Sequence, residues 1–112
     1  MKIYGEVTEK EAKVLKVMGT NKSLKDLVGR QFHIIGAVDT EEVKTADDGT
    51  EYVTNYCKLA TDDGEAHVVK FTQTIIMSQI AEIFNNDIAD IMYTLEYVNS
   101  ASGNKYLSIG LA

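Results

Sequence analysis

The sequence contains no proline and no tryptophan, a single cysteine and no long apolar run. Without proline, the sharp turns have to form at glycine. Because Cys57 has no second cysteine to pair with, the disulfide frameworks that stabilise small secreted domains are excluded. No segment approaches the roughly 20 apolar residues of a membrane-spanning helix, and residues 1–6 lack the apolar stretch of a secretion signal. We therefore expect a cytoplasmic protein with no membrane partner.

Positive charge is scarce and unevenly distributed. The chain has 17 acidic and 11 basic residues, for a net charge of −6. Such a balance disfavours binding of polyanions through overall electrostatic attraction. Residues 1–30, however, hold seven of the eleven cations and four of the 17 acids. Any contact with nucleic acid therefore has to come from local patches.

The second half of the chain has the pattern of β-hairpins. Three turn signals divide it: Asp47-Asp48-Gly49, Asp62-Asp63-Gly64 and Ser102-Gly103-Asn104. Asp-Gly between alternating segments is a strong hairpin signal, because glycine adopts positive φ freely. Gly36 interrupts the first segment and is expected to allow a bulge. The expected strands are 30–43, 51–60, 65–71, 88–99 and 105–112.

Two helices are expected beside these strands. From Thr72 to Asn86 the isoleucines and Phe84 recur at intervals of three and four, which is helical spacing. Near the amino terminus, Thr8 and Glu11 have the spacing of a capping box. A short helix should follow from there through Met18 and end at Gly19.

The order of these elements predicts the fold. A three-strand meander, a helix and then a hairpin is the order of the five-stranded OB barrel, in which the helix lies between strands three and four. We therefore expect a mainly β, five-stranded OB-like antiparallel barrel with a short N-terminal helix, forming one domain over 1–112. Residues 1–29 would be an N-terminal helical extension and 30–112 the barrel. An open α+β sheet is the competing architecture.

Signatures of catalysis and of metal binding are missing. The sequence has no phosphate-binding glycine loop, no dinucleotide fingerprint and no nucleophile elbow. His33, His67 and Cys57 lack the close spacing of zinc ligands. The acidic clusters fall at strand ends or turns and do not match a calcium-binding loop. We expect no enzyme, no cofactor and no metal.

The second expected strand carries the most informative pattern. Alternation places Tyr52, Tyr56 and Lys58 on one face. Two tyrosines four residues apart in a strand are separated by about 13 Å, so two bases of a single strand can stack on them while the lysine meets a phosphate. Tyrosines and lysines are also common on the solvent side of a strand without any such role. Four further residues extend the expected single-stranded DNA site: Lys44, Lys70, Lys105 and Tyr106.

Four segments add a resemblance to a known family. They are Ser23–Gly29, Asp48–Tyr52, Thr72–Ile75 and Ser102–Ile109. In this order and spacing, over roughly residues 13–111, the chain resembles the small single-stranded-DNA-binding proteins of tailed phages of Gram-positive bacteria, particularly those with protein-primed replication.

The resemblance implies an OB-like protein that coats displaced single strands during phage DNA replication in the host cytoplasm, without catalysis or cofactor. The aromatic-plus-basic mode of binding transfers to Tyr52, Tyr56, Lys58 and Tyr106. The expected partners are single-stranded DNA, replication proteins and a weak homo-oligomer. The alternative is a protein-interaction or assembly module with the same barrel and no nucleic-acid binding, which the net charge of −6 favours.

Overall fold

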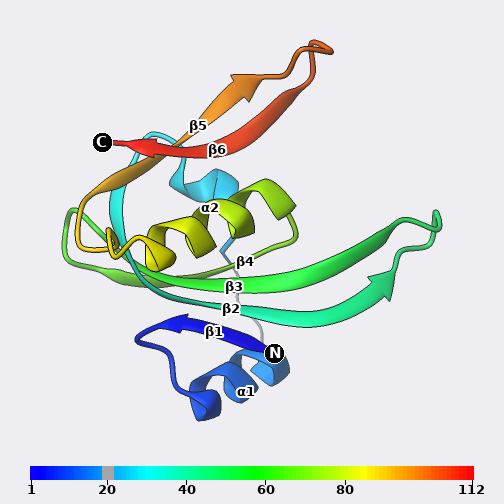
Figure 1. Ribbon diagram of the computed structural model, residues 1–112, viewed down its shortest axis with the longest axis horizontal. Helices are drawn as coiled ribbons and strands as arrows, with labels where there is room; N and C mark the ends of the chain where they lie inside the picture. Colours follow the sequence, from blue (N-terminus) through cyan, green and yellow to red (C-terminus); the bar gives the residue numbers. More distant parts are fainter. Residues whose placement is uncertain (19–21) are drawn as a thin grey trace.

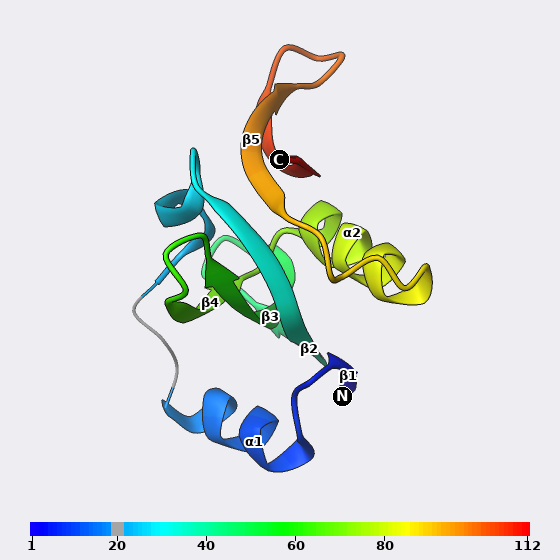
Figure 2. The same ribbon diagram turned by 90° about the vertical axis from the view of Figure 1, so that its left-hand side faces the viewer.

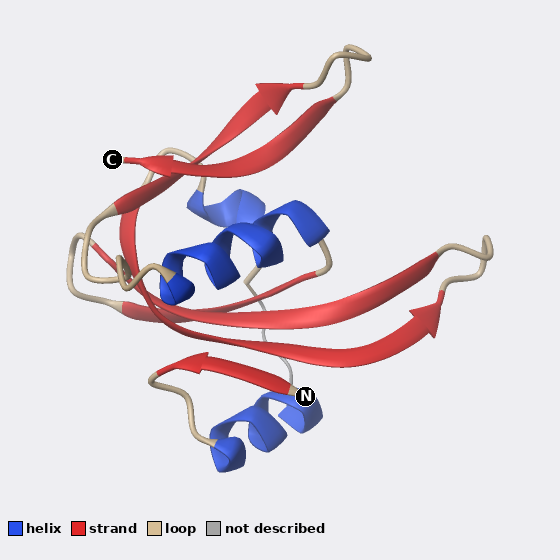
Figure 3. Ribbon diagram, in the orientation of Figure 1, coloured by secondary structure: helices blue, strands red, loops and turns tan. Residues whose placement is uncertain are grey.

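A computed structural model describes residues 1–18 and 22–112. The fold is mainly β, with a six-stranded antiparallel sheet and two α-helices (Figures 1 and 3). Gly19, the expected end of the first helix, lies outside the described residues. The elements in chain order are β1 (Lys2–Gly5), α1 (Glu9–Met18), the 3-10 helix η1 (Leu24–Leu27), β2 (Gln31–Thr45), β3 (Glu51–Thr61), β4 (Ala66–Phe71), α2 (Thr74–Asn85), β5 (Tyr93–Asn99) and β6 (Lys105–Leu111).

The sheet is organised around the long strand β2. The strand order is β4-β3-β2-β5-β6, and β1 also pairs with β2. The first residues of β2, Gln31 and Phe32, pair with β5, whereas the stretch from Gly36 to Asp39 pairs with β1. A register shift lies between Ile34 and Gly36, so the expected irregularity at this glycine is confirmed.

The expected closed five-stranded barrel is wrong. Among the described residues β4 and β6 do not pair, so the sheet stays open along the seam between them. The segment that precedes β2 occupies this seam: Lys22 bridges to Val69 of β4, and Val28 bridges to Leu95 of β5. Leu24 and Leu27 of η1 are buried there. The segment before β2 thus contacts β4 on one side and β5 on the other, where β4 and β6 remain unpaired.

Helix α2 packs on the inner side of the sheet. Its buried residues Ile76, Met77, Ile80 and Ile83 confirm the apolar stripe expected from the sequence. They join side chains from β2 to β6 and from η1 in the main core. Figures 1 and 2 show α2 between the β2–β3–β4 layer and the β5–β6 hairpin.

The outer side of the sheet is covered by the amino-terminal segment. Strand β1, which the sequence did not predict, pairs with β2, and α1 follows it on the side of the sheet away from α2 (Figure 2). The expected capping box starts α1: the Glu11 amide donates to Thr8 Oγ1 at 3.1 Å, and the Thr8 amide donates to Glu11 Oε1 at 3.5 Å. A second, smaller core forms beneath this helix from Val7, Ala12, Val38 and Tyr56.

Two hairpins extend beyond the body of the protein (Figure 1). Gly49 and Gly103 have positive φ at their tips, as expected, and Gly64 has positive φ at the turn between β3 and β4. The expected strand from residue 88 is too long, because β5 begins at Tyr93. Before it, the Ile88 amide bonds back to the Ile83 carbonyl at the end of α2. In the part of the chain that the structure describes, no helix combines the length and apolar character that a membrane crossing needs.

Candidate nucleic-acid interface

The tyrosine face expected on β3 is not an open surface. Alternation along β3 is as expected, but α1 covers this face. Tyr56 is 4% exposed and packs in the cluster with Val7, Ala12 and Val38. The expected exposure of the Tyr56 ring to bases is therefore wrong, because the amino-terminal helix lies on it.

The neighbouring cation of this face is already paired. Lys58 Nζ lies 3.4 Å from Glu11 Oε2 on α1. The amide of Thr8 and the Lys58 ammonium together lower the pKa of the Glu11 carboxyl. Lys58 thus connects the sheet to the helix that covers it.

Lys44 and Tyr52 lie apart from the other expected site residues. They are directly opposite one another in the register of β2 and β3, near the tip of the long hairpin. Lys44 is exposed and Tyr52 half-buried. A lysine and a tyrosine thus lie opposite one another near the tip of the β2–β3 hairpin.

Three of the expected residues do come together, at the open seam of the sheet. A cleft of about 500 Å3 lies there, and Lys70, Lys105 and Tyr106 line it. Lys25 and Tyr97, which the sequence reasoning did not select, line it as well. The remaining lining residues are Ser23, Leu24, Gln73 and Leu107.

Each cleft lysine comes from a different element. Lys25 lies on η1, which a second capping box holds: the Ser23 amide donates to Asp26 Oδ2 at 3.0 Å. This hydrogen bond lowers the pKa of the Asp26 carboxyl. Lys70 lies near the end of β4, and Lys105 begins β6 directly after the tip of its hairpin. The cleft therefore depends on the seam being open, since closure of the sheet would bring β4 against β6.

The charge of this cleft differs from that of the chain as a whole. The described residues that line it include three lysines and no carboxylate. All three lysines are exposed, and none forms an ion pair with a described acid. Lys16 and Lys58, by contrast, are paired with Glu42 and Glu11. The cleft thus gathers three lysines on an acidic protein, and of these Lys25 lies near enough to Asp26 to help lower the pKa of that carboxyl.

Tyr97 is the exposed aromatic ring of the cleft. It is 56% exposed, whereas Tyr106 is half-buried. Along β5, Tyr97 shares one face with Tyr93 and Leu95, which are buried, and its partner in the register, Leu107, is buried as well. The strand continues beyond the core at this point, so the inner face becomes a solvent-exposed wall. The turn signal at residues 102–104 could have predicted this exposure, because it places the end of β5 in a hairpin that extends beyond the core.

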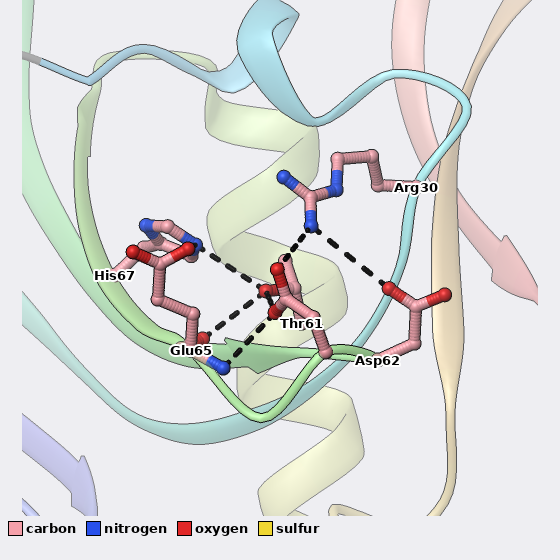
Figure 4. A network of polar contacts seen from close by, with 6 residues as sticks. Arg30, Thr61, Asp62, Glu65 and His67 are labelled. Carbon is pink, nitrogen blue, oxygen red and sulfur yellow. Dashed lines mark hydrogen bonds and ion pairs between the residues drawn. The ribbon is translucent and has the colours of Figure 1, made fainter.

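A second polar cluster lies at the turn between β3 and β4 (Figure 4). The Thr61 hydroxyl lies 3.3 Å from Nε2 of His67 and donates to Asp63 Oδ1 at 2.5 Å. Arg30 Nη2 approaches Asp63 Oδ2 at 3.1 Å and Asp62 Oδ1 at 3.9 Å. The Thr61 hydroxyl, the Glu65 amide and Arg30 lower the pKa of Asp63 to about 2. This cluster fixes the turn and the start of β2.

The remaining sequence candidates lie in structural positions. Burial raises the pKa of the Cys57 thiol to about 12, and the side chain lies in the main core. His67 is buried against the turn, while His33 is half-buried on β2. Within residues 1–18 and 22–112, no group of three or more His, Cys, Asp or Glu residues is placed to hold a metal ion.

No protein-family model, curated protein or solved structure matches this chain.

Proposed function

We propose that this protein binds single-stranded DNA, without sequence preference, in the cleft at the open seam of its sheet. The observation that carries the proposal is the gathering of three unpaired lysines with Tyr97 and Tyr106 around one cleft. Single strands are bound by a combination of cationic groups that follow the backbone and aromatic rings on which bases stack. Every base has a flat face, so stacking does not select among sequences.

The position of the cleft suits an extended ligand. It opens between β4, η1 and the projecting β5–β6 hairpin, so a strand can pass through without being enclosed. The OB fold is itself a partly open barrel, and the loops after its first and fourth strands contribute to nucleic-acid binding. The present chain corresponds to an OB-like domain that η1 keeps open. The β2–β3 and β5–β6 hairpins then take the place of the two nucleic-acid-binding loops of the OB fold.

The resemblance to phage single-stranded-DNA-binding proteins supports the same proposal. On that basis the protein coats displaced strands during phage DNA replication. Tyr56 and Lys58 no longer belong to the binding surface, because α1 covers the first and Glu11 pairs with the second. Lys44 and Tyr52, near the tip of the β2–β3 hairpin, remain as a separate pair of contacts for a longer DNA strand.

The net charge of −6 sets the expected salt dependence. Three lysines line the cleft, so a strand that occupies the cleft alone should release about three counterions. At about −0.7 per phosphate, a plot of log K against log salt should have a slope of about −2. Affinity should therefore be modest, and binding should be strongest at low salt.

The test is a titration of dye-labelled oligothymidine by fluorescence anisotropy at low salt. The triple variant Lys25→Gln, Lys70→Gln, Lys105→Gln is compared with Lys2→Gln, Lys10→Gln, Lys13→Gln, which removes the same charge at exposed positions outside the cleft. We expect the cleft variant to lose most of the salt slope and the control to keep it. Equal affinities for the two variants, or no binding by the wild type at high micromolar concentration, contradict the proposal.

A further inference from the structure

A second pocket on the inner side of the sheet has the opposite electrostatic character. Its volume is about 330 Å3, and it lies between the base of the long β2–β3 hairpin and the first half of α2. Its polar lining residues include Asp39, Glu41 and Asn55, and no lysine or arginine among the described residues lines it. A phosphate backbone is repelled by such a wall, so this pocket is separate from the proposed DNA cleft.

The side chain of Asn55 is incompletely hydrogen-bonded in this wall. Asn55 is 3% exposed, and its Nδ2 donates to the Val53 carbonyl at 3.4 Å. Its Oδ1 is the one buried side-chain nitrogen or oxygen of the described residues that has no hydrogen-bond partner. Reversing the amide would place oxygen against the Val53 carbonyl. A buried acceptor without a donor is destabilising, so a hydrogen-bond donor from a bound molecule would stabilise this position.

A carboxylate lies beside this acceptor. Asp39 is directly opposite Asn55 in the register of β2 and β3, and side chains at such positions are neighbours on one face. Asp39 Oδ1 accepts the Glu41 amide at 2.9 Å. A neutral donor can satisfy the Asn55 oxygen alone, but a cationic donor satisfies the amide and compensates the charge of Asp39 as well.

Two cations of the amino-terminal segment lie near this pocket, but they do not fill this role. Lys2 lies opposite Asp39 in the pairing of β1 with β2, yet the two form no ion pair in the described structure. The amino group of Met1 contacts Oε1 of Glu41, one of the lining residues, at 3.1 Å. Neither of them bonds to the Asn55 oxygen.

The apolar part of the lining matches a cation carried on a hydrocarbon stem. Tyr4, Val53, Met77 and Ala81 line the pocket, with the hydroxyls of Thr74 and Ser78 beside them. Lysine and arginine side chains bury their methylene stems against apolar surface and keep the charged end among polar groups.

We propose that this pocket binds an alkylammonium or alkylguanidinium group, presented as the end of a lysine or arginine side chain of a protein partner. Asp39 supplies the charge, Asn55 Oδ1 the buried acceptor and Met77 with Val53 the apolar wall. The proposal does not depend on DNA binding, because none of these residues lines the lysine cleft.

The test is an NMR titration of the full chain with N-acetyl-lysine methylamide and N-acetyl-arginine methylamide. The neutral analogues N-acetyl-norleucine methylamide and N-acetyl-citrulline methylamide are the matched probes. We expect saturable shifts of the Asp39, Asn55 and Ser78 amides at millimolar concentrations of the cationic probes only. Equal shifts with the neutral analogues, or no saturation with any probe, overturn the proposal.

Charge variants locate the binding to this pocket. Asp39→Asn should weaken the cationic probes about fivefold, the effect of losing about 1 kcal/mol of attraction in a solvated site. Glu51→Gln, which removes one charge from the same hairpin outside the pocket, should change their affinity less than twofold. Asn55→Asp should strengthen binding, and its spectrum shows directly whether it remains folded. An unchanged affinity in Asp39→Asn overturns the proposal.

Two further measurements identify the source of the cation. If a second copy of the chain supplies it, sedimentation will show concentration-dependent dimers that Asp39→Asn abolishes. If the chain remains monomeric while the probes bind, a different protein supplies it. If Lys2→Met destabilises the protein as Asp39→Asn does and the wild type binds no probe, Lys2 itself fills the pocket and the proposal is wrong.

Discussion

Gly5 of β1 lies directly opposite Gly36 of β2, and neither position has room for a β-carbon. A β-carbon on Gly5 would lie 2.4 Å from the Ile35 carbonyl oxygen. On Gly36 it would lie 2.5 Å from Val7 Cγ2 and 2.8 Å from the Tyr4 carbonyl oxygen. The two glycines allow the amino-terminal segment to approach β2 closely at the irregularity in that strand, and α1 is placed over the outer face as a result.

Gly5→Ala should destabilise the protein more than Gly49→Ala. Both positions have positive φ, which costs alanine about 1–2 kcal/mol. Gly49 has nothing within 4 Å of its added carbon, whereas overpacking at Gly5 should cost a further 1–3 kcal/mol or so. Urea unfolding followed by circular dichroism measures both free energies. Equal losses would mean that β1 is not held closely against β2.

Much of the fold could be predicted because local patterns specify it. The Asp-Gly and Ser-Gly signals placed the turns, and the isoleucine spacing placed α2 and its buried face. The open seam of the sheet, by contrast, is not specified by a local sequence pattern. It depends on Leu24 and Leu27 occupying the seam, and their short segment has too little periodicity to reveal where it packs.

The candidate site was predictable only in part, for the same reason. Alternation correctly placed Tyr56 and Cys57 on opposite faces of β3, but it cannot tell which face another element covers. Ala12 and Val7 belong to the segment that was expected to be an N-terminal helical extension of the barrel, yet they bury Tyr56. Tyr97 shares its face of β5 with the buried Tyr93 and Leu95 and is nevertheless exposed, because β5 continues past the core.

Tyr56 and Tyr97 should therefore respond oppositely to substitution. Tyr56→Ala leaves a cavity beneath α1 and should cost about 3–5 kcal/mol of stability. Tyr97→Ala, at a 56% exposed position, should change stability by about 0.5 kcal/mol or less and weaken oligothymidine binding about 5- to 150-fold through lost stacking. Thermal unfolding and anisotropy on the same samples separate the effects. Weaker DNA binding by a still-folded Tyr56→Ala than by Tyr97→Ala would reverse the assignment.

Acid should destabilise the protein partly through Asp63. Its pKa is lowered from 3.8 to about 2, so its contribution to stability is present above about pH 4 and is lost as the pH falls toward 2. Asp63→Asn should show a smaller drop in urea midpoint across that window than the wild type. Asp47→Asn removes the same charge at the tip of the β2–β3 hairpin and should show the same drop in urea midpoint as the wild type. Identical pH profiles for Asp63→Asn and the wild type would show that the turn network is not formed in solution.

Labelling of Cys57 should report opening of the core. The thiol is 2% exposed with a pKa of about 12, so at mildly alkaline pH it is both inaccessible and almost fully protonated. Thiol reagents react with the thiolate, and labelling therefore requires the core to open. We expect native protein to react at least about a thousandfold more slowly than protein in concentrated urea, in line with an ordinary folding equilibrium. A ligand that binds only the folded state lowers the fraction of molecules whose core is open. If opening of the core also disrupts the cleft, saturating oligothymidine should therefore slow the labelling of native Cys57 further. Complete labelling within minutes in native buffer would contradict the buried position of this side chain.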